Sequence, residues 1–305
     1  MLDWIALAAG TLGTSGMLAA CGTGSQAERQ KPVPGSLRDL ASGVQQLKLL
    51  SAQSELPRGR SRFAFGLLDE NNRLIEGVTP RVWLAKDQTS RARGPFPGRW
   101  LEMTGYDKTN DRSPRSDVTG YYLAEVDLPD PGKWLALAVV EVATQRAAAH
   151  GAVPVRPRVV TQVGTQAPAV QTPVATSQTD RHRICTRTPP CPMHDISFDD
   201  ALTSGKPTVL GVGTPLLCPS RMCGPVLDEQ LLVFQRFGGS KANFIHLEIY
   251  PERDQDKPAA LWTTWGFRNE PWTLVIDRNG IVRASLGDGP AAASEIGAAL
   301  QPLLS

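Results

Sequence analysis

The sequence predicts two folded domains, an antiparallel β-sandwich followed by an α/β domain. Residues 51–157 contain short runs in which apolar and polar residues alternate, separated by turns rich in Gly, Pro, Asn and Asp; this pattern is typical of strands in a sandwich. Residues 196–305 instead alternate strand patterns with helix patterns, which indicates an α/β fold. At 305 residues the chain is long enough for two domains with separate cores.

Composition excludes several classes of function. The 32 Lys and Arg residues nearly balance the 30 Asp and Glu residues, and no dense basic run could bind phosphates. We therefore expect no nucleic acid partner. The sequence has no phosphate-binding loop and no G-x-S-x-G motif, and its 4 histidines are too few to suggest a hydrolytic metal centre.

The N-terminal segment predicts export. Residues 4–20 are apolar but diluted by Gly, Thr and Ser, which fits a signal peptide better than a membrane span of about 20 residues. Leu18 to Cys21 (Leu-Ala-Ala-Cys) resembles the lipobox of bacterial lipoproteins. The resemblance implies that residues 1–21 are a signal peptide with its lipobox, cut just before Cys21. A diacylated Cys21 would then anchor the chain on the extracytoplasmic face of the membrane. Met1 to Asp3 lacks the usual positive charge, so an upstream start or an uncleaved anchor stays open.

Residues 22–50 are predicted to be a tether between the anchor and the folded body. Gln, Gly, Ser and Pro are frequent in its first part, as in flexible linkers. Residues 36–50 could form a short helix, because apolar residues recur there at steps of three and four and Ser36 is a suitable N-cap.

The predicted sandwich, residues 51–157, has no cluster of catalytic side chains, so we expect a spacer or an interaction module. Pro131 to Trp134 (Pro-Gly-Lys-Trp) leads into an apolar strand and resembles the late strands of immunoglobulin-like modules. Residues 91–116 are rich in Gly, Pro and charge, and we expect a long exposed loop there.

Residues 158–195 form a second predicted linker, rich in Thr and Pro, that carries Cys185 and Cys191. Because cysteines of exported proteins usually oxidise, a local disulfide is the favoured interpretation. His182 and His194 flank the pair, so a zinc or copper site is the alternative. The spacing matches no standard zinc finger, and we expect no metal.

Residues 196–305 resemble the thioredoxin family. The predicted order is strand, helix, strand, helix, strand, strand and helix, at residues 208–213, 224–237, 243–249, 259–265, 272–277, 281–286 and 291–304. The stretches that carry the resemblance are Val209 to Cys218, Pro225 to Glu229, and Gly266 to Gly280. The resemblance implies a thioredoxin-like fold with a redox-active cysteine beside a helix N-terminus, where backbone N–H groups stabilise a thiolate.

By this resemblance, Cys218 is the attacking cysteine, Cys223 the resolving one, and Pro271 the cis-proline that faces them. The sequence departs from the family in three ways. The cysteines are spaced as C-x4-C instead of C-x-x-C, Leu217 replaces an aromatic residue, and Val212 stands where the family has a buried acid.

We therefore expect a cofactor-free protein that exchanges disulfides with envelope proteins carrying thiols or disulfides. Whether it is an active oxidoreductase stays open. The first alternative is a non-enzymatic binding or scaffolding lipoprotein whose disulfides are structural. The second is copper binding, because Cys218-Pro219 and Tyr250 to Asp254 resemble Sco-type chaperones. Those proteins use a histidine that has no counterpart after His246, and His246 itself is expected to be a core residue.

Overall fold

The computed structural model describes residues 33–105, 119–142, 145–157, 162–250 and 257–305. The predicted signal peptide, Cys21 and residues 22–32 of the predicted tether lie outside these residues. Val33–Ser305 forms one compact unit. Within the described residues, no helix has the length and apolar character needed to cross a bilayer.

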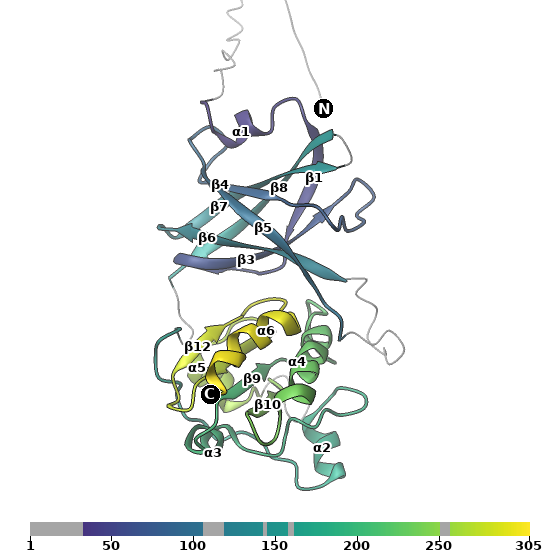
Figure 1. Cartoon of the computed structure of the whole chain (residues 1–305), viewed down its shortest axis with the longest axis vertical. Coiled ribbons are helices and arrows are strands. Elements are labelled where there is room, and N and C mark those ends of the chain that lie inside the picture. The colour runs from purple at the N-terminus through teal and green to yellow at the C-terminus, as the bar shows by residue number, and fades with distance from the viewer. Residues whose placement is uncertain (1–32, 106–118, 143–144, 158–161, 251–256) are drawn as a thin grey trace, which may run out of the picture. The chain divides into compact units, whose positions relative to one another are not determined.

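The unit contains a β-domain followed by an α/β domain (Figure 1). The β-domain elements are α1 (Leu37–Leu40), β1 (Gln45–Ser51), β2 (Leu56–Pro57), β3 (Gly59–Leu68), β4 (Arg81–Ala85), β5 (Arg93–Glu102), β6 (Gly120–Leu128), β7 (Gly132–Val142) and β8 (Gln145–Arg156). The α/β elements are α2 (Gln178–Ile184), α3 (Phe198–Thr203), β9 (Thr208–Val212), α4 (Cys223–Phe237), β10 (Asn243–Leu247), α5 (Ala260–Trp265), β11 (Trp272–Ile276), β12 (Val282–Ser285), α6 (Ala293–Leu300) and the 3-10 turn η1 (Gln301–Leu303).

The β-domain is a closed barrel, so the predicted immunoglobulin-like sandwich is not what the structure shows. Its strands follow the order β1-β3-β6-β5-β4-β7-β8, and β1 also pairs in parallel with β8, with Gln45 opposite Ala147. This pairing joins the two edges of the sheet and makes it mixed instead of purely antiparallel. Alternating apolar residues predict one buried face per strand in a sandwich and in a barrel alike, so the sequence could not distinguish them.

Two segments of the barrel differ from the sequence predictions. The helix expected over residues 36–50 is limited to α1, and β1 follows it, with Leu47 and Leu49 buried on alternate positions. The exposed loop expected over residues 91–116 contains β5. Its polar and proline-rich sequence is tolerated because most of its side chains face outward.

The α/β domain has a thioredoxin-like fold, as predicted. Its described sheet has the order β10-β9-β11-β12, in which β9 and β10 are parallel while β11 and β12 run antiparallel to their neighbours. Helices α4 and α6 cover one face through side chains such as Val226 and Ile296. Helices α3 and α5 cover the other through Phe198 and Leu261. Every predicted element appears within a few residues of its expected position.

The two domains share a buried contact. Outward-facing Ala64 and Tyr121 of the barrel belong to the same apolar cluster as the helices α4 and α6. At its edge, Arg62 donates to both carboxylate oxygens of Glu295, at 2.9 and 2.8 Å, and Tyr121 donates to the same carboxylate at 2.7 Å. The barrel is therefore packed against the thioredoxin-like domain through specific polar and apolar contacts.

Candidate active site

Cys218 and Cys223 form a disulfide at the start of α4, with their Cα atoms 6.0 Å apart. The C-x4-C spacing is accommodated because the intervening residues form a loop and the helix begins only at Cys223. Arg221 in this loop adopts a left-handed conformation, with φ of 59°. The longer spacing therefore changes the loop before the helix and leaves the two cysteines close enough to bond.

The surroundings of the two sulfur atoms differ. Cys218 Sγ accepts a hydrogen bond from the backbone N–H of Cys223 at 3.3 Å and lies 3.3 Å from the hydroxyl of Ser220. Cys218 is 8% exposed and Cys223 is 3% exposed. Donors at a helix N-terminus stabilise a thiolate, so after reduction Cys218 is the sulfur better placed to carry negative charge and meet a substrate.

Pro271 lies beside this disulfide, and the peptide bond before it is cis. Gly213, just after β9, brings them together. A Cβ atom at position 213 would lie 3.3 Å from Cys223 Sγ and 3.5 Å from Pro271 Cβ, a tight fit that a glycine avoids. The end of β9, the cis-proline loop and the N-terminus of α4 thus meet at one point.

Glu270 supplies a carboxyl group that the sequence analysis did not single out. Its side-chain oxygen and both active-site sulfurs lie within 4.8 Å of one another. The backbone N–H of Thr214 donates to Glu270 Oε2 at 2.6 Å and fixes the side chain. Burial raises the pKa of Glu270 to about 7, which suits a group that gains and loses a proton near neutral pH.

The strand pairing explains why Glu270 lies beside the cysteines. Val212 stands where the family has its buried acid, and Val212 pairs with Trp272 in the sheet. Residues just before Trp272 therefore come alongside the end of β9, and Glu270 is the acid among them. A carboxyl group thus reaches the cysteine pair from the neighbouring strand.

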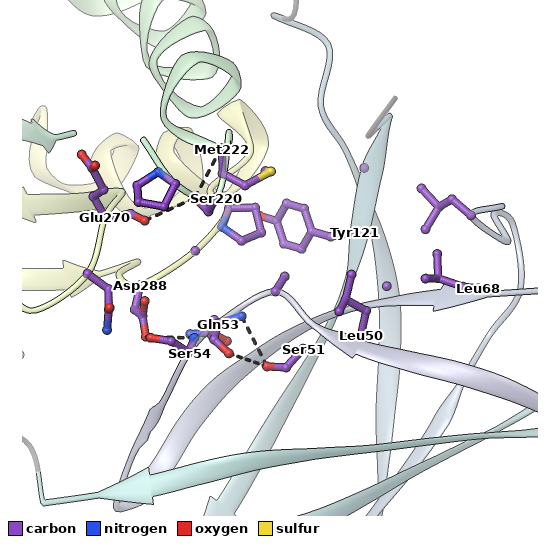
Figure 2. Close-up of a pocket in the computed structure, with 18 of the residues that line it drawn as sticks. Leu50, Ser51, Gln53, Ser54, Leu68, Tyr121, Ser220, Met222, Glu270 and Asp288 are labelled. Atoms are coloured by element: carbon purple, nitrogen blue, oxygen red, sulfur yellow. Dashed lines mark hydrogen bonds between the residues drawn. The ribbon is translucent and has the colours of Figure 1, made fainter. Parts of the chain in front are cut away.

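A pocket of about 900 Å³ opens beside the active-site loop. Figure 2 shows Ser220, Met222 and Glu270 on one side of it and Leu50 and Leu68 of the barrel on the other. Its lining mixes apolar side chains, such as Leu50, Leu68 and Met222, with polar ones, such as Ser220 and Glu270. Such a pocket has the character of a ligand-binding or peptide-binding site.

The second cysteine pair differs from its prediction. Cys185 and Cys191 are buried free thiols, not the expected disulfide. The loop after α2 directs both sulfurs toward His246 of β10, at 3.8 and 3.4 Å from its Nδ1. His194 joins this group, whereas His182 is exposed on α2 and takes no part in it. Sequence reasoning could not place His246 here because it lies more than fifty residues away in the chain.

The chain is similar to solved structures over about half of its length. No family model and no curated protein matches the chain. Among solved structures, a protein assigned as thiol:disulfide interchange protein DsbE from Chlorobium tepidum is 15% identical, with 48% of this chain and 99% of that one covered and a TM-score of 0.31. A thiol-disulfide isomerase from Corynebacterium glutamicum is 17% identical over 46% of this chain and 97% of that one, with a TM-score of 0.32. The fold assignment itself rests on the strand order and connectivity described above.

Proposed function

We propose that this chain is a thiol–disulfide exchange protein of the cell envelope, anchored through a lipid on Cys21. The observation that carries the redox activity is the position of Glu270, whose carboxyl group lies beside the Cys218–Cys223 disulfide. A purely structural disulfide needs no proton acceptor, whereas exchange needs one when the second thiol attacks.

The reduced protein would act in two steps. The thiolate of Cys218 attacks one sulfur of a substrate disulfide, which forms a mixed disulfide and releases the other substrate sulfur as a thiolate. Glu270 then takes the proton of Cys223, and the resulting thiolate attacks Cys218 Sγ. The Cys218–Cys223 disulfide forms again, and the substrate, now a dithiol, has received two electrons. The reverse sequence would oxidise a substrate dithiol.

The pocket beside the loop supports a polypeptide as the substrate. It is formed by both domains, with Leu50 and Leu68 facing Met222 across it. Leu50 is 59% exposed, an apolar side chain at the edge of the pocket that could contact a peptide. The barrel would thus help to position a substrate chain near Cys218.

The reduction potential of the Cys218–Cys223 pair tests the redox activity. We would equilibrate the purified full chain in graded thiol buffers and measure the bonding by peptide mass spectrometry. A potential between about −270 and −120 mV is expected for an exchange catalyst. A potential below about −300 mV would identify a structural bond and support the scaffolding alternative.

Trapping the mixed disulfide with a substrate protein tests the roles of the two cysteines, and the two Cys→Ser variants serve as controls for each other. With Cys223→Ser, the mixed disulfide between Cys218 and a substrate protein should accumulate, because the resolving thiol is gone. With Cys218→Ser, it should not form. Equal trapping by both variants would contradict the assignment of Cys218 as the attacking residue.

The lipid anchor is tested separately. The wild-type chain expressed in a bacterial host should incorporate labelled fatty acid and sediment with membranes, and Cys21→Ser should do neither. Fatty acid incorporation by Cys21→Ser, or its absence from the wild type, would contradict lipidation at this residue.

A further inference from the structure

Cys185, Cys191, His194 and His246 form a compact cluster on the α/β domain. Their ligand atoms all lie within 4.8 Å of one another. All four residues are buried, with exposed fractions of 2%, 0%, 2% and 4%. Two thiols and two imidazoles make up a donor set that is typical of closed, four-coordinate zinc sites. We propose that this cluster binds one Zn²⁺ ion as a structural site.

The distances fit tetrahedral coordination. With Zn–S bonds of about 2.3 Å and Zn–N bonds of about 2.0–2.1 Å, a tetrahedron separates a sulfur from a nitrogen by about 3.5 Å. Cys191 Sγ lies 3.3 Å from His194 Nε2 and 3.4 Å from His246 Nδ1, and Cys185 Sγ lies 3.8 Å from His246 Nδ1. The donor atoms are therefore close to the positions that a shared ion requires.

Neighbouring groups orient the donors. His246 Nε2 lies 2.9 Å from the carbonyl oxygen of Gly213, which can only accept, so Nε2 carries the proton and Nδ1 presents a lone pair to the sulfurs. Metal-binding histidines commonly have their second ring nitrogen fixed in this way. The backbone N–H of Cys191 donates to Cys185 Sγ at 3.3 Å, as it would to a thiolate ligand.

The local fold indicates what the ion would stabilise. Within α2, no residue is buried, so this helix gains little from apolar packing. The loop from Cys185 to Ser197 is irregular and is joined to β10 by a backbone hydrogen bond from His246 to Met193. Three ligands from this loop and one from β10 would fasten it to the central sheet. Because all four positions are filled by protein and buried, the site is structural instead of catalytic.

Zinc content of the full chain tests the proposal. We would purify the protein without chelator and measure its zinc content by elemental mass spectrometry. About one zinc ion per chain is expected in the wild type. Cys191→Ser and His246→Asn should lose it. His182→Asn, which changes an exposed histidine of the same segment, should retain it, as should the double variant Cys218→Ser/Cys223→Ser.

Cobalt substitution keeps the test valid if a variant fails to fold. The wild-type protein loaded with Co²⁺ should show the intense visible absorption of a tetrahedral site and a sulfur-to-cobalt charge-transfer band. Absence of both spectral features, or a Cys185–Cys191 disulfide in the purified protein, would overturn the proposal. Binding of Cu(I) in preference to Zn²⁺ would overturn the choice of metal. Since the double active-site variant is expected to keep zinc, this inference can fail or succeed independently of the redox function.

Discussion

The backbone N–H of Thr214 donates a 2.6 Å hydrogen bond to the side chain of Glu270, and this contact holds the carboxyl group beside the active-site disulfide. Thr214 follows β9 and Glu270 precedes β11, so the antiparallel pairing of these strands brings them together. The thioredoxin-like sheet thus places a carboxyl group beside the disulfide, at a position where the family resemblance did not place one.

Replacing Glu270 should change the pH dependence of exchange. Since burial raises the pKa of Glu270 to about 7, the carboxylate that would accept the Cys223 proton predominates only above that pH. We expect the rate of substrate release from the mixed disulfide to rise with pH through about 7. Glu270→Gln should lose this rise and be slower by roughly 10²-fold at pH 8. Stopped-flow measurements from about pH 5 to about pH 8, where most proteins are most stable, would check this. An unchanged profile would exclude Glu270 as the acceptor.

Glu270 should also make the free energy of unfolding depend on pH, in a definite direction. Its pKa is higher in the folded protein than its ordinary value of 4.5, so the folded state binds the proton more tightly. The contribution of Glu270 to the free energy of unfolding is therefore favourable at low pH and is lost as pH rises toward 7. Urea unfolding of the oxidised protein should show Glu270→Gln gaining stability relative to wild type across this interval. A constant difference would show that the carboxyl group is not buried as described.

Removing the hydroxyl of Ser220 should lower the reactivity of Cys218. The hydroxyl lies 3.3 Å from Cys218 Sγ and can donate to the thiolate after reduction. A hydrogen bond to a charged group contributes about 1.5–3 kcal/mol, so Ser220→Ala should slow alkylation of reduced Cys218 by roughly 10-fold at neutral pH. Alkylation of Cys223→Ser/Ser220→Ala, compared with Cys223→Ser alone, isolates this thiol. Equal rates would show that Ser220 does not stabilise the thiolate.

The contact between the domains should depend on Glu295. The Arg62 and Glu295 side chains are 10% and 11% exposed, and removing one charge leaves the other buried without its partner. Breaking such a pair costs about 3–5 kcal/mol, so Glu295→Gln should lower the free energy of unfolding by roughly this amount. Glu102→Gln is the matched control, because Glu102 is an exposed carboxylate on β5 of the same barrel. Equal effects of the two variants in denaturant unfolding would contradict a role for the buried pair.

Chelation should destabilise the protein if zinc occupies the Cys185–His246 cluster. An ion present at about 100 times its dissociation constant contributes about 2.7 kcal/mol to the folded state. Removing it should lower the melting temperature by roughly 5 °C or more. Chelator already loaded with zinc is the control and should have no effect, and neither reagent should affect Cys191→Ser. If free chelator leaves the melting temperature of the wild type unchanged, this result would argue against a structural ion.

The sequence predicted the thioredoxin-like domain well for a definite reason. Its strands are short apolar runs and its helices carry an apolar stripe, so local periodicity marks each one. The helix expected at residues 224–237 is α4, Cys223–Phe237, and the strand expected at residues 272–277 is β11, Trp272–Ile276. The hairpin turn between Asp277 and Ile281 was equally clear from its Asn-Gly pair.

The barrel was predicted less well because its closure is not local. The β1–β8 pairing joins residues about a hundred positions apart in the chain. The spacing of apolar residues within β1 does not indicate which strand it pairs with. Apolar residues at Leu37, Leu40 and Leu47 suggested a helix, although Leu47 and Leu49 face the barrel interior from a strand. Tertiary pairing overrode the local pattern here.

The sequence by itself predicted the strands and helices of the α/β domain from residue 208 onward, but not α2 or α3. The family resemblance implied the pairing of Cys218 with Cys223 near a helix N-terminus. Only the tertiary structure decided the surroundings of the four described cysteines: Glu270 beside one pair, and His246 facing the other. The periodicity of apolar residues shows which face of a helix or strand is buried. This pattern relates only near neighbours in the chain, about one helical turn or two strand residues apart. A proton acceptor or a metal ligand is defined by which strands become neighbours, and that depends on the whole sheet.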